Sequence, residues 1–166
     1  MKRWVALFLI LLLTAPLSGC ARAARPEDFY SFRRKLDHSM VMEVGITMEQ
    51  LYPLAASGLG SNEGIWAKFD SSHIVTSINN RSNIYETMNG LSTDNKLSEV
   101  LPAYAGDPDV TVVQQTGTEI ILQKMIDGTR YTATFLAYAD GSLKTITLTN
   151  QDTCTDEVID HTSEAF

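Results

Sequence analysis

Three short turn signals divide the second half of this chain into β-rich runs of similar length. Asp127-Gly128 and Asp140-Gly141 are the clearest, and Thr116-Gly117 is the third. An Asp-Gly pair favours a two-residue turn with positive φ at both positions, and such a turn joins antiparallel strands. The spacing therefore predicts an antiparallel meander of four strands, at residues 110–115, 119–126, 130–138 and 142–149.

A helix signal followed by a hairpin precedes the meander. Thr47 and Gln50 have the spacing of a capping box, which predicts the start of a helix. Pro53 falls at its sixth position, so the helix is expected to be short or bent. Residues 65–69 and 73–78 then predict a β-hairpin, whose buried face carries Ile65, Ala67, Phe69, Ile74 and Ile78.

The two halves of the chain share a pattern. A second helix signal, before Gly106-Asp-Pro108, places Leu97, Val100, Leu101 and Tyr104 at helical spacing. Residues 49–56 can be laid on residues 98–105, which indicates a diverged duplication, with chance similarity as the alternative.

The expected fold class is α+β, with two diverged helix-plus-antiparallel-sheet units forming one domain. The units span about residues 40–82 and 88–150 of a domain at residues 37–150. An acidic tail at residues 151–166 follows, and its weak periodicity predicts that it is loosely held.

The N-terminus resembles a bacterial lipoprotein signal. A basic start, Lys2-Arg3, precedes about ten apolar residues, too few to span a bilayer. Leu17-Ser18-Gly19-Cys20 resembles a lipobox, so residues 1–19 are expected to be removed and Cys20 to carry fatty acyl chains such as palmitate. Two or three chains hold a protein firmly on a membrane. The alternative is an ordinary secretory signal with a chance cysteine.

Charge is unevenly distributed along the chain beyond the signal. Residues 20–36 carry five basic and two acidic side chains, whereas residues 37–166 carry 6 basic and 18 acidic ones, a net charge of −12. The first segment is expected to be a basic tether lying toward anionic headgroups, or else a solvated helix start. The acidic body argues against a nucleic-acid partner.

Catalytic and metal-binding motifs are absent from the sequence. Cys154 is the only cysteine besides Cys20, so lipidation leaves no intramolecular disulfide, and Cys154 either joins two chains or is inert. The three histidines, His38, His73 and His161, lack neighbours at metal-ligand spacing. Serines occur outside any nucleophile elbow. We therefore expect no metal, no cofactor and no enzymatic activity.

The strongest candidate for a binding residue is Trp66. Strand alternation that buries Ile65 and Phe69 turns Trp66 to the other face with Lys68 and Asp70. Tryptophan is a frequent interface anchor, although a covering helix or the second unit would make it a core residue. The alternation also places two further side chains on an outward face, and these extend the candidate surface: Leu136 and Tyr138.

About 37 residues, from Val44-Gly45-Ile46-Thr47 through Trp66 to Asn80, resemble the SmpA/OmlA (BamE-like) family of small lipoproteins. The resemblance implies an α+β domain anchored to the periplasmic face of the outer membrane, binding protein or lipid without catalysis. That family usually continues its helix with Leu-Gly-x-Pro, whereas Leu54 here leads to Ala-Ala-Ser-Gly. The duplicated plan is instead similar to the β-lactamase-inhibitor-protein-like (BLIP-like) architecture, in which two units form one saddle-shaped sheet.

These observations favour a membrane-anchored, extracytoplasmic, non-catalytic module for protein interaction or envelope assembly. The partner is expected to be an envelope protein. An inhibitor of an extracytoplasmic hydrolase is the alternative, and a hydrolase with an unrecognised site is a third reading. Ala21 favours the outer membrane in a host with two membranes, while the envelope type, the oligomeric state and the partner stay open.

Overall fold

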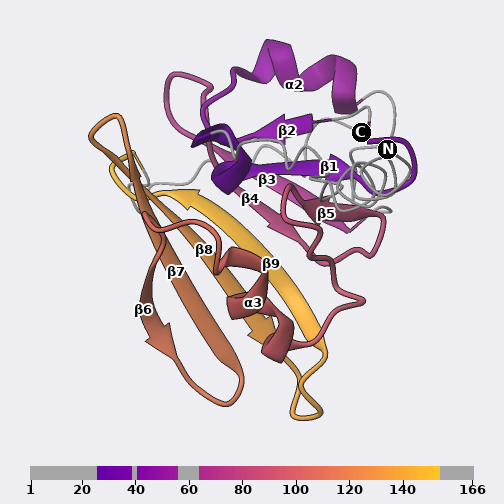
Figure 1. Cartoon of the computed structure of the whole chain (residues 1–166). Helices are drawn as coiled ribbons and strands as arrows, with labels where there is room; N and C mark the ends of the chain where they lie inside the picture. The colour runs from indigo at the N-terminus through magenta and orange to yellow at the C-terminus, as the bar shows by residue number, and fades with distance from the viewer. Residues whose placement is uncertain (1–25, 39–40, 56–63, 154–166) are drawn as a thin grey trace, which may run out of the picture.

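The computed structural model describes residues 26–38, 41–55 and 64–153. These residues form two antiparallel sheets and a few short helices (Figure 1). The larger sheet has six strands in the order β3-β4-β9-β8-β7-β6. The expected α+β class and its antiparallel pairing are confirmed at this level.

The four-strand meander forms within one or two residues of its expected bounds. Its strands are β6 (Thr111–Gln115), β7 (Glu119–Ile126), β8 (Thr129–Ala137) and β9 (Leu143–Asn150). Asp127 and Gly128 have φ values of 50° and 83°, and their neighbours Ile126 and Thr129 pair directly. The Asp-Gly pair therefore makes the mirror-image two-residue turn that its composition predicts.

The predicted hairpin also forms, and it joins the meander. Strand β4 (Val75–Asn80) pairs with β3 (Ile65–Phe69) on one side and with β9 on the other. A bulge between Lys68 and Phe69 shifts the register, so Phe69 faces Val75. The sequence prediction that Ile74 lies on the buried face is therefore corrected: Val75 is buried there, and Ile74 lies outside the strand.

A second sheet, with order β2-β1-β5, is built from short strands that the sequence did not predict. They are β1 (Ser31–Arg34), β2 (Val41–Glu43) and β5 (Tyr85–Thr87), and a 3₁₀ helix, η1 (Pro26–Tyr30), precedes them. Phe29 and Phe32 are buried in the core. The expected tether at residues 20–36 is therefore corrected for its second half, because the folded domain already includes Pro26 and does not begin at residue 37.

The helices are short. Helix α2 (Met48–Ala55) begins with the predicted capping box, in which the Thr47 amide donates to Gln50 Oε1 at 2.9 Å and the Gln50 amide to Thr47 Oγ1 at 3.3 Å. The second helix signal forms η2 (Leu97–Glu99) and α3 (Val100–Tyr104). Both helices lie at the expected places, and Pro53 sits inside an eight-residue helix.

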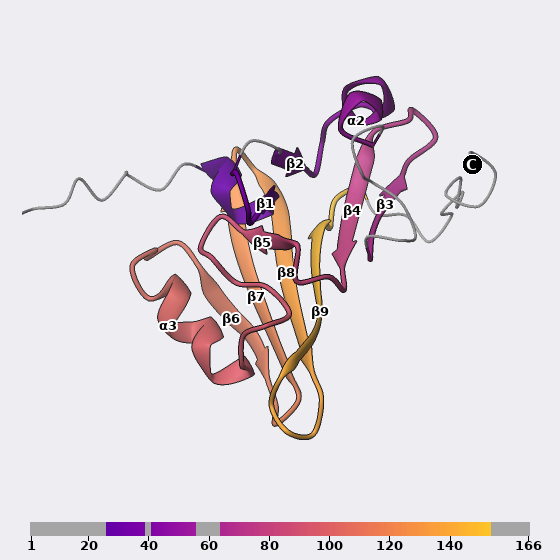
Figure 2. The ribbon, with the colours of Figure 1, turned by 90° about the vertical axis from the view of Figure 1, so that its right-hand side faces the viewer.

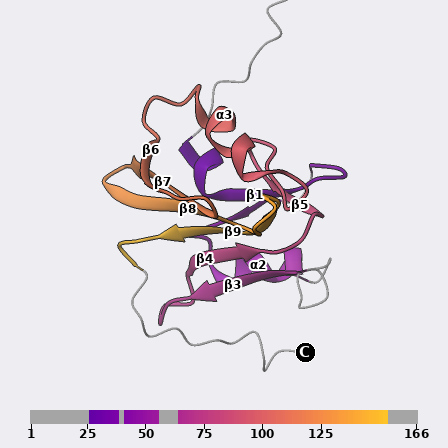
Figure 3. The same ribbon diagram turned by 90° about the horizontal axis from the view of Figure 1, so that it is seen from below.

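The core lies on one face of the six-stranded sheet. One row of side chains across four strands illustrates this. Its members face the core and are all buried: Asn80, Ile146, Phe135 and Ile120. Helix α3 and strands β1 and β5 lie on this side (Figures 2 and 3). The opposite face of β4, β9 and β8 carries the alternate side chains, which are predominantly hydroxyl-bearing.

Candidate interaction site

The face of the six-stranded sheet that points away from the core is rich in short polar side chains. Register places Asn79, Thr147 and Thr134 in one row across β4, β9 and β8. The rows on either side continue the pattern. We call the following set the hydroxyl-rich face: Ser77, Asn79, Thr132, Thr134, Thr145, Thr147 and Thr149.

Hydrogen bonds across the strands order this face. Asn79 donates from Nδ2 to Thr147 Oγ1 at 2.8 Å, and the hydroxyls of Ser77 and Thr149 lie 3.0 Å apart. The Oδ1 atom of Asn79 is buried and has no hydrogen-bond partner among the described residues. These cross-strand hydrogen bonds pre-organise the face.

Trp66 lies at the edge of the hydroxyl-rich face, in register with Asn79. Its ring is half-buried, and the guanidinium carbon of Arg81 lies 5.2 Å from the ring centroid. This geometry suits a cation–π contact. Trp66 is neither a core residue nor fully exposed, and the exposed Arg81 side chain lies over its ring.

The other residues predicted beside Trp66 have different roles. Lys68 is exposed and pairs with Ser77 in the strand register, so it shares the face. Asp70 lies beyond β3, where its Oδ1 accepts the amides of Ser72 at 2.8 Å and Ile74 at 2.9 Å. Because this oxygen already accepts two amides of the hairpin turn, Asp70 stabilises the turn and is not a candidate contact for a partner.

Leu136 and Tyr138 are exposed, by 37% and 54%. Leu136 pairs with Thr145 on the hydroxyl-rich face, three strands away from β3, which is about 14 Å at the usual strand spacing. Tyr138 lies past the end of β8, with the Lys144 ammonium 5.7 Å from its ring centroid. Trp66 and Leu136 therefore flank the face without touching each other.

Two of the basic residues before residue 37, Arg33 and Lys35, are paired with carboxylates of the domain. The Nε atom of Arg33 donates to Glu86 Oε1 at 2.8 Å, and the Lys35 ammonium lies 3.0 Å from Asp94 Oδ2. Their charges are matched within the domain, and the expectation that the basic segment lies toward anionic headgroups stays a prediction.

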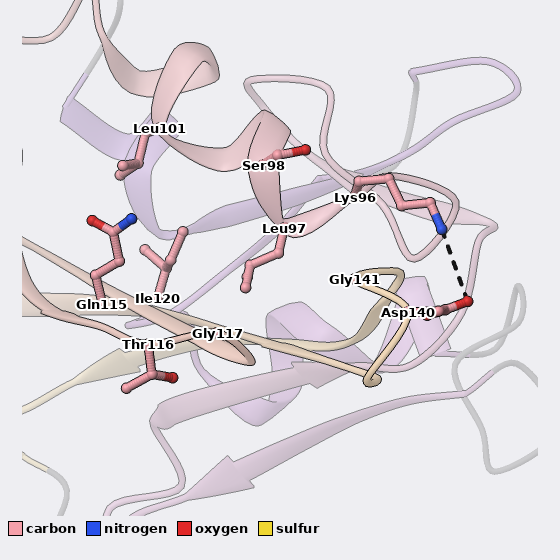
Figure 4. A pocket seen from close by; sticks show the side chains of 10 residues that line it. All are labelled: Lys96, Leu97, Ser98, Leu101, Gln115, Thr116, Gly117, Ile120, Asp140 and Gly141. Carbon is pink, nitrogen blue, oxygen red and sulfur yellow. Dashed lines mark ion pairs between the residues drawn. The ribbon is translucent and has the colours of Figure 1, made fainter.

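An open pocket of about 680 Å³ lies on the core side of the sheet, between the helical segment and two hairpin turns (Figure 4). Its floor is apolar, and Lys96 and Asp140 form an ion pair of 3.9 Å at its rim. The residues that line it are Lys96, Leu97, Ser98, Leu101, Gln115, Thr116, Gly117, Ile120, Asp140 and Gly141.

Asp140 and Glu99, two carboxylates near this pocket, accept hydrogen bonds from residues close to them in the chain. Hydrogen bonds from Ser142 lower the pKa of Asp140, and a hydrogen bond from the Asn95 side chain, then one from the Lys96 amide, lower the pKa of Glu99. A general acid at neutral pH needs a raised pKa, so neither group is suited to that role. Within residues 26–38, 41–55 and 64–153, no three His, Cys, Asp or Glu side chains gather as metal ligands.

The sequence interpretation missed Asn79, Arg81 and the threonines as surface residues, although the sequence carried a signal for the threonines. Alternating hydroxyl residues in β9 and β8 mark an ordered polar face of a sheet. Arg81 had no such signal, because its contact with Trp66 depends on how the chain leaves β4. Cys20, Cys154 and His161 lie outside the described residues.

Comparisons with known proteins give no relative from which to transfer a function. No family model, no curated protein and no solved structure matches this chain. None of the helices in the described ranges combines the length and apolar character that crossing a membrane requires.

Proposed function

We propose that this protein is a membrane-anchored, extracytoplasmic lipoprotein that binds another envelope protein without catalysis. The observation that carries the proposal is the hydroxyl-rich face. It is ordered by its own hydrogen bonds, bordered by Trp66 and Leu136, and opposite to the face on which the core lies.

Such a face is suited to a protein surface. Ser77, Thr132 and Thr145 are buried, so the half-buried residues Asn79, Thr134, Thr147 and Thr149 are those that a partner would contact. Their side chains are short, so a partner can approach closely, and their order reduces the entropy lost on binding. Trp66 supplies a large apolar anchor at the edge of this face. The net charge of −12 on residues 37–166 favours a partner with a basic surface.

The anchor in this proposal is Cys20, whose sequence context resembles a lipobox. The BamE-like resemblance supports an assembly role at the outer membrane. The duplicated architecture belongs to the same proposal. Its support is that α2 precedes the β3–β4 hairpin, η2 and α3 precede the meander, and the two groups of strands join through β4 and β9 in one sheet.

A photo-crosslinking residue in place of Thr147 tests the binding face in living cells. The expected result is a covalent adduct with one defined envelope protein, because Thr147 lies at the centre of the hydroxyl-rich face. The control carries the same residue in place of Leu36, an exposed position in the turn after β1. An identical adduct pattern at both positions, or no adduct at Thr147, contradicts the proposal.

Once that partner is purified, Trp66→Ala measures the anchor. We expect its affinity to fall at least tenfold, with a thermal midpoint close to that of the unchanged chain, because the ring lies outside the core. Leu36→Ala is the matched control and should bind unchanged. Equal affinity of the two variants argues against Trp66, and unfolding of Trp66→Ala makes it a structural residue.

The identity of the partner separates the two candidate functions. A hydrolase that loses activity in a one-to-one complex supports the inhibitor alternative, for which the acidic charge is the favouring observation. The anchor is tested separately. Cys20→Ser should move the protein from the membrane fraction to the soluble fraction, and mass spectrometry should find acyl chains on Cys20 of the unchanged protein.

A further inference from the structure

Strand β6 is an open edge of the larger sheet. Within the described ranges it pairs with β7 on one side and with no strand on the other. All five of its residues are exposed, including Val112 at 50% and Val113 at 58%. The strand contains no charge and no proline, the residues that usually protect an edge from pairing. Its remaining protection is the bulge between Val112 and Gln114.

The hydrogen-bonding groups at the end of this edge point outward. Thr116 donates its amide to the Glu119 carbonyl at 2.7 Å, so Thr116 faces β7. Since successive residues of a strand face opposite sides, the N–H and C=O of Gln115 face away from the sheet. An extended chain beside β6 would find a donor and an acceptor there.

The pocket lies beside the same end of β6. Gln115 and Ile120 line it from the sheet, and Leu97 and Leu101 line it from the helical segment, as Figure 4 shows. A strand added to β6 would therefore run along a groove between the sheet edge and α3. Every second side chain of that strand would point to the core side, where the apolar floor of the pocket is open.

The negative charge at the two ends of the groove determines which extended peptides it favours. Asp109 is exposed before β6, and Glu119 and Asp140 lie near its other end. Among the described residues nearby, Lys96 lies beside Asp140 and Lys124 pairs with Asp107, so the carboxylates outnumber the ammonium groups. This surplus of carboxylates favours basic residues on both sides of an apolar one. It disfavours a second copy of β6, which would bring the same carboxylates together.

We propose that β6 and the adjacent pocket form a second binding site, which takes an extended peptide segment of a partner protein by strand addition. The segment carries one bulky apolar side chain for the pocket and Lys or Arg on each side of it. The site is independent of the hydroxyl-rich face, because it lies at the sheet edge and on the core side of the sheet.

A displayed library of random twelve-residue peptides, selected on the full chain, tests this site. We expect enriched peptides with alternating β-branched or apolar residues and flanking basic residues. Added to the ¹⁵N-labelled full chain, such a peptide should slow hydrogen exchange at the Gln115 amide at least tenfold. Recovery of no binding peptide, or of peptides that leave this amide unprotected, overturns the proposal.

Gln115→Pro and Gln115→Ala form a matched pair. Both remove the same side chain, but only proline removes the outward N–H, and an edge strand tolerates that loss. We expect the proline variant to bind the selected peptide at least tenfold more weakly and the alanine variant to bind within about threefold of the unchanged chain. Equal binding by the two variants excludes strand addition.

Analytical sedimentation tests the alternative that a second copy of this chain, rather than a peptide, pairs with β6. A concentration-dependent dimer of the full chain that Gln115→Pro abolishes would assign the edge to a second copy and overturn the peptide site. A monomer across the tested range, together with the proline effect on peptide binding, supports it. Leu101→Lys adds an independent readout, because a charge in the pocket should weaken peptides with an apolar anchor when the chemical shifts of the core show an intact fold.

Discussion

At the scale of single residues, Tyr104 is a core residue whose phenol hydroxyl is buried together with its ring. Its ring makes edge-to-face contacts with Phe29 and Phe135, with centroids 5.9 and 6.0 Å away. Burial raises the pKa of Tyr104 to about 12. The folded state therefore holds this phenol in its neutral form at pH values where an unfolded chain has already lost the proton.

This difference makes stability depend on pH in the alkaline range. Between pH 10 and about 12 the unfolded state binds fewer protons than the folded state, so the free energy of unfolding should fall as pH rises, by about 2 kcal/mol from Tyr104. Tyr104→Phe should lose this part of the decline. Urea unfolding of both proteins at pH 8 and pH 11.5 measures it, and parallel declines would contradict the assignment.

Arg33 and Glu86 give a second prediction at this scale. The Glu86 side chain is only 8% exposed, and Arg33 neutralises it. Arg33→Ala should lower the free energy of unfolding by about 2 kcal/mol, because it leaves a buried carboxylate without its main partner. Lys35→Ala breaks an exposed pair with Asp94 and should cost less than about 1 kcal/mol. Equal costs in chemical denaturation would show that burial does not matter here.

At the scale of elements, the connections of the meander place different conformational demands on their glycines. Gly128 has a φ of +83° and no atom within 4 Å of an added Cβ, so a side chain there would be strained by conformation alone. Gly117 also has open space, without a φ in the positive range. The two glycines therefore separate backbone strain from packing.

Gly128→Ala should destabilise the domain by about 1 kcal/mol, whereas Gly117→Ala should change the free energy of unfolding by less than about 0.5 kcal/mol. Thermal or urea unfolding of the two variants provides the comparison. A larger loss of stability for Gly117→Ala would mean that the β6–β7 connection, rather than the β7–β8 turn, requires a glycine.

At the scale of the whole molecule, the core is enclosed by two sheets contributed by distant parts of the chain. Phe32 on β1 pairs with Thr87 on β5 and with Met42 on β2, and all three are buried. Tyr30 stacks on Tyr131 of β8 with ring centroids 4.5 Å apart. Residues 26–36 are thus part of the domain and not an accessory to it.

A chain that starts at residue 37 should therefore fail to fold cooperatively, whereas one that starts at residue 21 should fold. The shorter chain lacks Phe29 and Phe32, and losing each large buried aromatic costs about 3–5 kcal/mol, comparable to the whole stability of a small domain. Near-ultraviolet circular dichroism and amide dispersion decide between the outcomes. A native-like spectrum of the shorter chain would show that η1 and β1 are dispensable.

Local chemistry alone determined much of this fold. The Asp-Gly turn at 127–128, the Thr47 and Gln50 capping box and the alternation of the hairpin each act over a few neighbouring residues, so they can be read directly from the chain. The lipobox-like sequence before Cys20 is likewise a linear motif, and the lipidation that it indicates stays a prediction.

Tertiary structure decided what depends on distant partners. Strands β1, β2 and β5 are three or four residues long and exist because they pair with each other, and β4 meets β9 across about 70 residues of chain. Likewise, alternation placed Trp66 on the outer face, but the packing of Arg81 decided how much of its ring is covered. Pairing and coverage of this kind depend on loop closure and on the shape of the whole core, for which no short stretch of sequence carries a signal.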